Sequence, residues 1–113
     1  MTAAQLSVEE KRTAGESVLV LSGEIDMATA GHLRSAVDDL VGRSHGRIVL
    51  DFAGVTFCDS QGLSTLIAAN RAAEAAGDRL VLVNVGDFVQ RLFDITGLRT
   101  VFAIEDGSDD SLP

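Results

Sequence analysis

The segment that most constrains the fold is residues 55–63, Val-Thr-Phe-Cys-Asp-Ser-Gln-Gly-Leu. An apolar strand is predicted before it at 47–52, and an alanine-rich helix follows it from Ser60 to about Ala76. Ser60 therefore lies where a helix begins, a position at which serine often caps free backbone N–H groups. The same position exposes a hydroxyl at the end of a sheet, where open α/β folds place their sites. Ser60 is thus either a helix cap or a hydroxyl that another molecule contacts.

Hydrophobic periodicity predicts strands and helices in the order β-β-α-β-α-β-α-β. The first two strands form a hairpin, and each later strand follows a helix in a right-handed parallel crossover. The predicted fold is a single α/β domain with a mixed, mostly parallel β-sheet, one antiparallel edge strand and helices packed against the sheet. The expected strands are at 6–12, 17–22, 47–52, 79–84 and 101–104. The first helix is capped by Asp26 and ended by Gly42, and the second begins at Ser60. The third helix runs from Asp87 to Gly97, and its apolar side consists of Phe88, Val89, Leu92 and Phe93.

The composition supports one domain with an aliphatic core. The chain has 113 residues, of which 46% are hydrophobic, and it contains no Trp or Tyr. This length suits one domain rather than two. We place the domain at residues 6–104, after a short N-terminal extension at 1–5. Residues 105–113 are small and acidic and contain no basic residue, so we expect a disordered acidic tail.

Charge and cysteine content exclude several classes of protein. The net charge is −8 and the nine basic residues are scattered, whereas a nucleic-acid surface needs clustered Lys and Arg. Cys58 is the only cysteine, which excludes an internal disulfide and falls short of a zinc site. The N-terminal residues have no apolar signal core, and no charge-free apolar run approaches the ~20 residues that cross a membrane. We therefore expect a soluble cytoplasmic protein that binds neither membrane nor nucleic acid.

Serine hydrolysis is not favoured, although a serine at a strand-to-helix turn is similar to the nucleophile elbow G-x-S-x-G. Here residues 58–62 lack the first glycine. A catalytic triad also needs a histidine base. His45 precedes the strand that leads to Ser60, and a strand of that length separates them by roughly 17–20 Å. His32 lies beside the apolar side of the first helix. Both histidines are expected to be surface residues, so no catalytic residue is predicted.

Two aspartates follow neighbouring predicted strands. A right-handed crossover places Asp26 and Asp59 at the same pole of the sheet, where two carboxylates could hold a magnesium ion. The favoured interpretation is that each one caps or orients a helix N-terminus, where negative charge is stabilising by ~0.3–1 kcal/mol. Glycine-rich phosphate loops are absent, and Cys58 has no basic neighbour, so it is expected to be an inert buried thiol. No metal and no cofactor are predicted.

What is left is an exposed hydroxyl flanked by carboxylates, which suits a protein that is acted upon. A phosphoryl group on Ser60 would add a charge of roughly −1.5 to −2. Its oxygens can accept N–H bonds at the start of a helix, so the fold should tolerate it. A partner docked over Ser60 would not, because it would have to desolvate that charge beside Asp26 and Asp59.

Three stretches carry a family resemblance: Gly-Glu-Ile-Asp at 23–26, Phe-Cys-Asp-Ser-Gln-Gly-Leu at 57–63, and a third-helix segment at 89–98 that ends in Thr-Gly-Leu. In this order and spacing they resemble the signatures of the bacterial anti-sigma-factor antagonists of the STAS superfamily (sulfate transporter and anti-sigma-factor antagonist domains). The central stretch is similar to the phosphorylation motif of that family. The resemblance covers roughly residues 6–104 and implies a STAS-like fold of the kind predicted above.

The resemblance also implies a switch. The unphosphorylated protein would bind an anti-sigma factor that is a serine kinase, and sigma factor would be released. The kinase would use ATP to phosphorylate Ser60, which would end binding, and a metal-dependent serine phosphatase acting on phospho-Ser60 would restore it. The alternative is a non-phosphorylated STAS scaffold or interaction module of a stress-signalling or transport complex. The presence of Ser60 favours the switch.

The resemblance implies a surface for the partner around the acceptor serine. Ser64 and Thr65, one turn further on, are competing acceptors. Gln61 stands where the family often has a small residue, which bears on the choice of kinase. The partner-binding residues implied are Asp26, Asp59, Ser60, Gln61 and Ser64.

Overall fold

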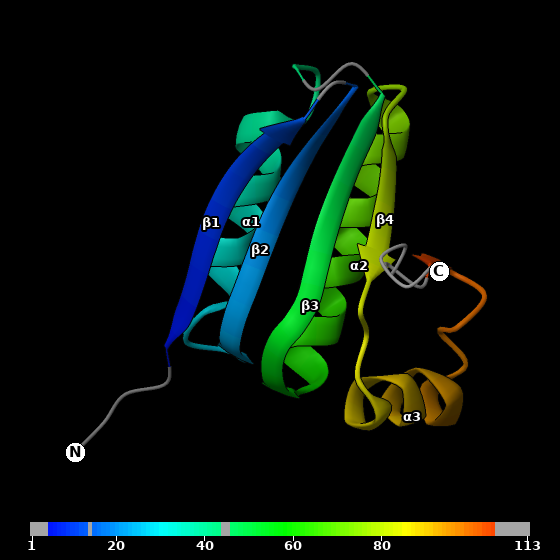
Figure 1. Cartoon of the computed structure of the whole chain (residues 1–113). Coiled ribbons are helices and arrows are strands. Elements are labelled where there is room, and N and C mark those ends of the chain that lie inside the picture. Colours follow the sequence, from blue (N-terminus) through cyan, green and yellow to red (C-terminus); the bar gives the residue numbers. More distant parts are fainter. Residues whose placement is uncertain (1–4, 14, 44–45, 106–113) are drawn as a thin grey trace, which may run out of the picture.

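The computed structural model describes residues 5–13, 15–43 and 46–105 (Figure 1). The elements follow the predicted order. They are β1 (Leu6–Thr13), β2 (Glu16–Ile25), α1 (Ala30–Leu40), β3 (Arg47–Cys58), α2 (Ser60–Ala75), β4 (Arg79–Val83), α3 (Asp87–Thr96) and β5 (Ala103–Glu105). No helix in these ranges is both long enough and apolar enough to span a membrane.

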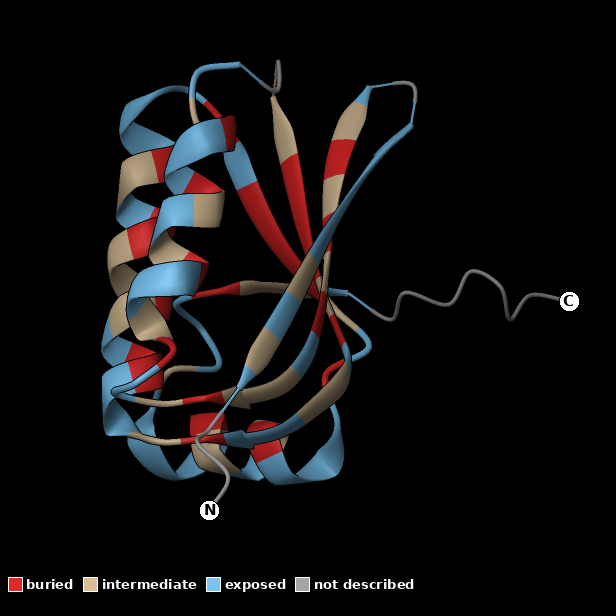
Figure 2. Ribbon diagram, turned by 90° about the vertical axis from the view of Figure 1, so that its left-hand side faces the viewer, coloured by how far each residue is buried: buried red, intermediate tan, exposed pale blue. Residues whose placement is uncertain are grey.

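Five strands form one sheet in the order β1-β2-β3-β4-β5. β1 runs antiparallel to β2, and the other neighbours are parallel. The predicted fold class is therefore confirmed. α1 and α2 cover one face of the sheet, whereas α3 lies at the pole of the molecule where β2, β3 and β4 end (Figure 1 and Figure 2).

The core lies between the sheet and the two covering helices. Successive strand residues point to opposite faces, so alternate residues of β2, β3 and β4 meet α1 and α2. Ala69 and Ala73 are fully buried on α2, and their small side chains let this helix approach the sheet closely. The buried residues of this layer include Leu19, Leu21, Leu33, Val37, Ile48, Leu50, Leu66, Leu80 and Leu82.

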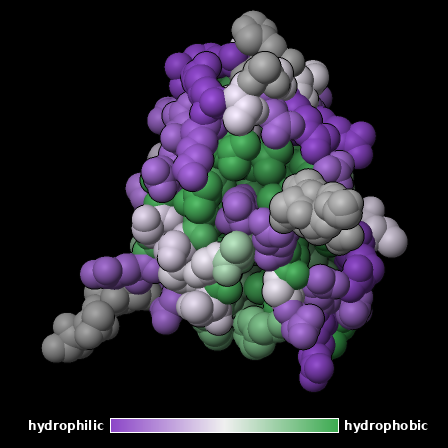
Figure 3. Space-filling view, in the orientation of Figure 1, coloured by the Kyte–Doolittle hydropathy of each residue, from purple (hydrophilic) through white to green (hydrophobic). Residues whose placement is uncertain are grey.

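The opposite face of the sheet is covered by neither α1 nor α2. Figure 3 shows this face, with an apolar area surrounded by hydrophilic side chains. Val49 and Val81 pair across β3 and β4 on this face and are buried. Arg47 contacts Glu16 at 2.8 Å and Glu105 at 2.7 Å, which links β2, β3 and β5. The hydrogen bond from Arg47 holds the pKa of the Glu105 carboxyl below its usual value.

β3 is longer than predicted, because it continues past residue 52 to Cys58. Small and polar residues after Phe52 interrupt the apolar pattern, but the end of β2 supplies backbone partners for them. Register shifts between β2 and β3 accommodate the change, with Ser22 paired to Gly54. A Cβ on Gly54 would lie 2.9 Å from the carbonyl oxygen of Leu21, so glycine permits this close pairing.

The prediction that Asp26 caps the first helix is wrong. α1 begins at Ala30, and the Asp26 carboxylate instead accepts N–H bonds from Ala28 and Thr29, at 2.9 and 3.1 Å. Thr29 fastens the same turn, because its hydroxyl donates to the carbonyl oxygen of Glu24 at 2.7 Å. Asp26 therefore caps the turn that leads into the helix.

α3 confirms part of its predicted apolar side. Val89 and Phe93 are buried, but Phe88 is 53% exposed, so Phe88 does not belong to the buried side of the helix as predicted. Gly97 ends the helix in the left-handed conformation, with φ of 75°. Leu98 folds back as expected, and its N–H donates to the carbonyl oxygen of Phe93 at 2.8 Å.

β5 occupies Ala103–Glu105 rather than 101–104. Phe102 instead packs in the core against Phe93, with ring centroids 5.2 Å apart. Glu105 belongs to the sheet and to the ion pair with Arg47, not to the predicted tail. The rest of that tail, 106–113, and most of the predicted extension, 1–4, lie outside the described residues.

Candidate functional site

The junction of β3 and α2 is built around Asp59, which is the N-cap of α2. Its carboxylate accepts the Gly62 N–H at 2.9 Å, and its carbonyl oxygen accepts the Leu63 N–H, also at 2.9 Å. Ser60 is the first residue of the helix and is exposed. The interpretation of Ser60 as the cap is therefore wrong. Within the described part of the chain its hydroxyl makes no hydrogen bond, which leaves it available to another molecule.

Gly62 allows the first turn of α2 to pack directly on the end of β2. The Asp59 N–H donates to the carbonyl oxygen of Ile25 at 3.1 Å. A Cβ on Gly62 would lie 2.5 Å from that same oxygen and 2.9 Å from the sulfur of Cys58. Real Cβ atoms essentially never approach backbone so closely, so this position requires glycine.

This packing brings the two predicted aspartates together at one pole. Ile25 pairs with Cys58 across β2 and β3, so Asp26 and Asp59 follow directly on paired residues. The expectation that Asp26 lies at the same pole as Ser60 on a neighbouring strand is confirmed. Each carboxylate is occupied with backbone N–H groups. Across the described ranges, no three side chains suited to metal binding form a group.

The remaining predicted site residues lie on the first turns of α2. Gln61 and Ser64 are exposed, and Thr65 is half-buried. Ser64 follows Ser60 by four residues, so the two hydroxyls lie on the same side of the helix. The structure therefore places Ser60, Gln61 and Ser64 on one accessible surface.

Cys58 does not add a reactive group to this surface. Cys58 is only 2% exposed. Burial, together with the charge of Asp59, raises the pKa of the thiol to about 12, so it is protonated at neutral pH and the predicted inert thiol is supported. His32 is exposed on α1. His45 lies outside the described residues.

Sequence reasoning missed an aromatic pair beside the serine. Phe57 and Phe88 stack with ring centroids 6.0 Å apart and an angle of 26° between the ring planes. Phe57 is 40% exposed, and Met27, which follows Asp26, is 75% exposed. There was no clear sequence signal for Phe57, because the predicted strand ended at residue 52. In the structure Phe57 alternates with the buried Cys58 along β3 and so faces away from the core.

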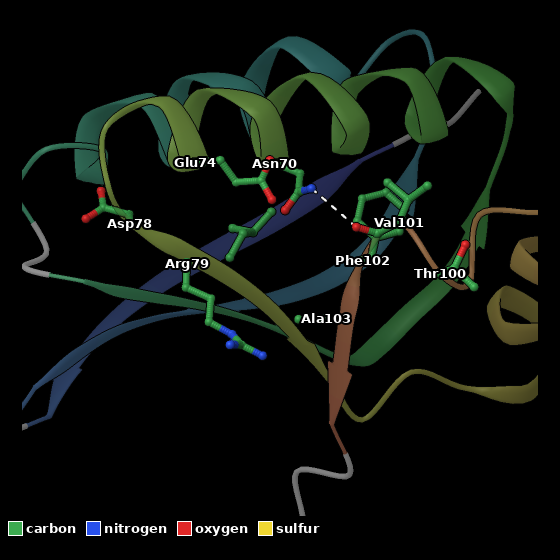
Figure 4. A pocket seen from close by; sticks show the side chains of 9 residues that line it. Asn70, Glu74, Asp78, Arg79, Thr100, Val101, Phe102 and Ala103 are labelled. Atoms are coloured by element: carbon green, nitrogen blue, oxygen red, sulfur yellow. Dashed lines mark hydrogen bonds between the residues drawn. The ribbon is translucent and has the colours of Figure 1, made fainter.

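A pocket of about 360 Å³ lies between the second half of α2 and the edge formed by β4 and β5 (Figure 4). Its two buried polar side chains have structural partners. Asn70 donates to the carbonyl oxygen of Val101 at 3.5 Å, and Asp78 accepts the N–H groups of Gly42 and Gly46. The pocket is lined by the C-terminal part of α2, so it is separate from Ser60 at the other end of that helix.

Comparisons with known proteins match the chain over nearly its whole length. A family model described as "Mlab, STAS domain" matches residues 8–104. The chain is 29% identical over 108 residues to the anti-sigma F factor antagonist of Paenibacillus polymyxa, which covers 95% of this chain and 92% of that protein. It is 31% identical to a solved anti-sigma factor antagonist from Mycobacterium paratuberculosis, with a TM-score of 0.82 and coverage of 94% and 90%.

A second solved structure shares the fold at lower identity. The Bacillus cell fate determinant SpoIIAA in its phosphorylated form has a TM-score of 0.70 and 22% identity, and the match covers 92% of this chain and 94% of that one.

The fit at Gly62 predicts that Gly62→Ala lowers the free energy of unfolding. Overpacking of this kind costs about 1–3 kcal/mol. Gly31→Ala is the matched control, because Gly31 lies on α1 and a Cβ there would meet nothing within 4 Å. The control should raise stability by up to about 1 kcal/mol through helix propensity. Urea unfolding of both variants measures the difference, and equal stabilities would contradict the tight fit.

The hydrogen bonds at the start of α2 predict different costs for two adjacent substitutions. Asp59→Ala removes the cap and should lower the free energy of unfolding by about 0.5–2 kcal/mol, whereas Asp59→Asn should retain most of it. Ser60→Ala removes no hydrogen bond and should stay within about 0.5 kcal/mol of wild type. Thermal and urea unfolding monitored by circular dichroism compare the three. A larger loss for Ser60→Ala than for Asp59→Ala would restore Ser60 as the cap.

Proposed function

The chain belongs to the STAS domain family, and on that basis we propose that it is an anti-sigma-factor antagonist switched by phosphorylation of Ser60. The chain matches two proteins over most of their lengths, one curated relative and one solved structure. Both are named as anti-sigma factor antagonists. The observation that carries the proposal is the position of Ser60. Its hydroxyl is exposed at the first turn of α2, and the capping that would otherwise occupy it is performed by Asp59.

In the proposed cycle, the unphosphorylated surface binds an anti-sigma factor that is a serine kinase, and sigma factor is released. The Ser60 oxygen then attacks the γ-phosphorus of ATP. The new O–P bond replaces the bond to the β-phosphate, ADP leaves, and the hydroxyl proton is lost. A serine phosphatase hydrolyses phospho-Ser60 and returns the chain to its binding form.

The local structure suits a phosphoserine without a change of fold. The first backbone N–H groups of a helix have no partner within the helix. The Asp59 carboxylate accepts the N–H of Gly62. The N–H groups of Ser60 and Gln61 are therefore left as donors for phosphate oxygens. The added charge of roughly −2 lies at the pole that already holds Asp26 and Asp59. A docked partner would have to desolvate this charge, so phosphorylation opposes binding.

Phosphorylation is predicted at Ser60 rather than at Ser64 or Thr65. Ser60 is exposed at the helix start, whereas Thr65 is half-buried and Ser64 lies a turn further from the pole. The test is incubation with purified candidate anti-sigma-factor kinases and ATP, followed by intact-mass measurement and peptide mapping. Phosphate found mainly on Ser64 or Thr65 would sink the assignment. A chain that binds such a kinase but is never phosphorylated would be a scaffold instead.

The same kinase should distinguish Ser60→Ala from Ser60→Glu. The alanine variant should bind like wild type and stay in the binding form. The glutamate variant should bind roughly tenfold more weakly or worse, because it places a charge in the interface. Titration calorimetry without ATP measures both affinities. Equal affinities would show that Ser60 lies outside the interface.

Asp26 is proposed to present Ser60 or to contact the partner as well as to cap its turn. Asn caps about as well as Asp, so Asp26→Asn should melt like wild type yet be phosphorylated several-fold more slowly or bind more weakly. Asp26→Ala is the control for the capping role and should be less stable, because it loses both turn hydrogen bonds. Wild-type kinetics for Asp26→Asn beside a destabilised Asp26→Ala would leave Asp26 as a structural residue only.

A further inference from the structure

Exposed apolar side chains gather at the pole that carries Ser60. Over the described residues, the large hydrophobic side chains that are exposed are Met27, Phe57, Phe88, Ile95 and Val101. Met27 follows the end of β2, Phe57 lies near the end of β3, and Phe88 begins α3. In Figure 3 apolar surface appears at the lower end of the molecule, where Figure 1 places the end of β3 and the start of α3.

The two phenylalanines form a single unit across two elements. Their stacked rings, 6.0 Å apart, join β3 to α3. Both rings are only partly buried, because 40% of Phe57 and 53% of Phe88 remain accessible. α3 already packs on the domain through Val89 and Phe93, which lie on a different side of the helix from Phe88. The pair therefore leaves apolar surface exposed beside α3.

Carboxylates border this apolar surface. Asp26 precedes Met27, Asp87 precedes Phe88, and Asp59 follows Phe57 by two residues. Aromatic side chains and methionine are enriched in protein interfaces, and an apolar centre with a polar rim is the usual arrangement of an interface. A partner complementary to this surface presents an apolar pocket with basic residues around it.

We propose that Phe57 and Phe88 form an apolar anchor that binds a basic-rimmed apolar pocket on the anti-sigma-factor kinase. This proposal rests on the proposed function. In it, the anchor supplies binding affinity for the kinase, and phosphorylation of Ser60 regulates that binding. The anchor lies at the same pole as Ser60, because Phe57 precedes Ser60 by three residues at the junction of β3 and α2. Burying apolar area is favourable in proportion to the area removed from water, so two half-exposed rings can contribute substantially to such an interface.

The test is titration of the full chain and its variants with the purified kinase, by calorimetry without ATP and by Ser60 phosphorylation kinetics with ATP. Phe88→Ala and Phe57→Ala should each raise Kd by about tenfold, as hot-spot truncations do. The KM for this chain should rise in parallel while kcat stays unchanged, because the anchor contributes binding and not chemistry. Phe88→Tyr should restore binding.

The matched control is Val101→Ala, which removes a similarly exposed apolar side chain at the pocket beside Asn70 and should bind like wild type. Circular dichroism confirms that each variant is folded, and the comparison of Phe88→Tyr with Phe88→Ala holds even where the alanine variant loses stability.

The possible results distinguish failure of the proposed anchor from failure of the proposed Ser60 switch. Unchanged Kd for the phenylalanine variants, with Ser60 still phosphorylated, overturns the anchor and leaves the switch. Weakened binding by these variants to a kinase that never modifies Ser60 supports the anchor and overturns the switch. Equal weakening by Val101→Ala overturns the anchor as a specific surface. No binding of wild type to any candidate anti-sigma-factor kinase overturns both.

Discussion

The geometry of the candidate site depends on the contact between the first turn of α2 and the end of β2. The carbonyl oxygen of Ile25 accepts the Asp59 N–H, and Gly62 lies so close to that oxygen that a side chain would not fit. The contact fixes α2 against β2 as well as against β3, from which it emerges. Because Asp26 follows Ile25 directly, its position relative to Ser60 is fixed by the same contact. The glycine of the motif is thus a packing requirement and the serine is not.

A division of roles between adjacent residues follows from this arrangement. A helix start needs an acceptor for its free N–H groups, and Asp59 supplies it by bonding to Gly62. Ser60 is thereby released from the structural task that its position suggests. A residue that both capped the helix and accepted phosphate would couple the modification to local stability. Because Asp59 is the cap, the proposed modification of Ser60 would change the surface charge while the fold stays constant.

The order of elements, the fold class and the pole that holds the candidate site could all be predicted from periodicity and crossover geometry. The wrong predictions concern features that depend on contacts between segments distant in the sequence. Nothing local distinguishes Asp59 from Ser60 as the cap, since both are good capping residues. β3 extends beyond residue 52 only because β2 lies alongside it. Phe88 fits the apolar periodicity of α3, but periodicity alone does not show which of the apolar residues of this helix are buried against the rest of the domain. The aromatic pair joins segments far apart in the sequence, and its stacking appears only once the chain is folded.

The proposed apolar anchor and the proposed phosphorylation of Ser60 must have comparable energies if the switch is to work. Two unit charges 4 Å apart interact by about 4 kcal/mol near a protein surface, and a shift of that size changes an equilibrium constant by roughly three orders of magnitude. Phosphorylation can release a partner only if the favourable binding energy does not greatly exceed this penalty. Phe57 and Phe88 are partly covered by each other and by the fold, so each has only part of its area left to bury in a complex. A larger, fully exposed apolar surface would bind more tightly but would hold the partner after modification. The modest exposure of the pair is therefore compatible with an interface that a single phosphate can open.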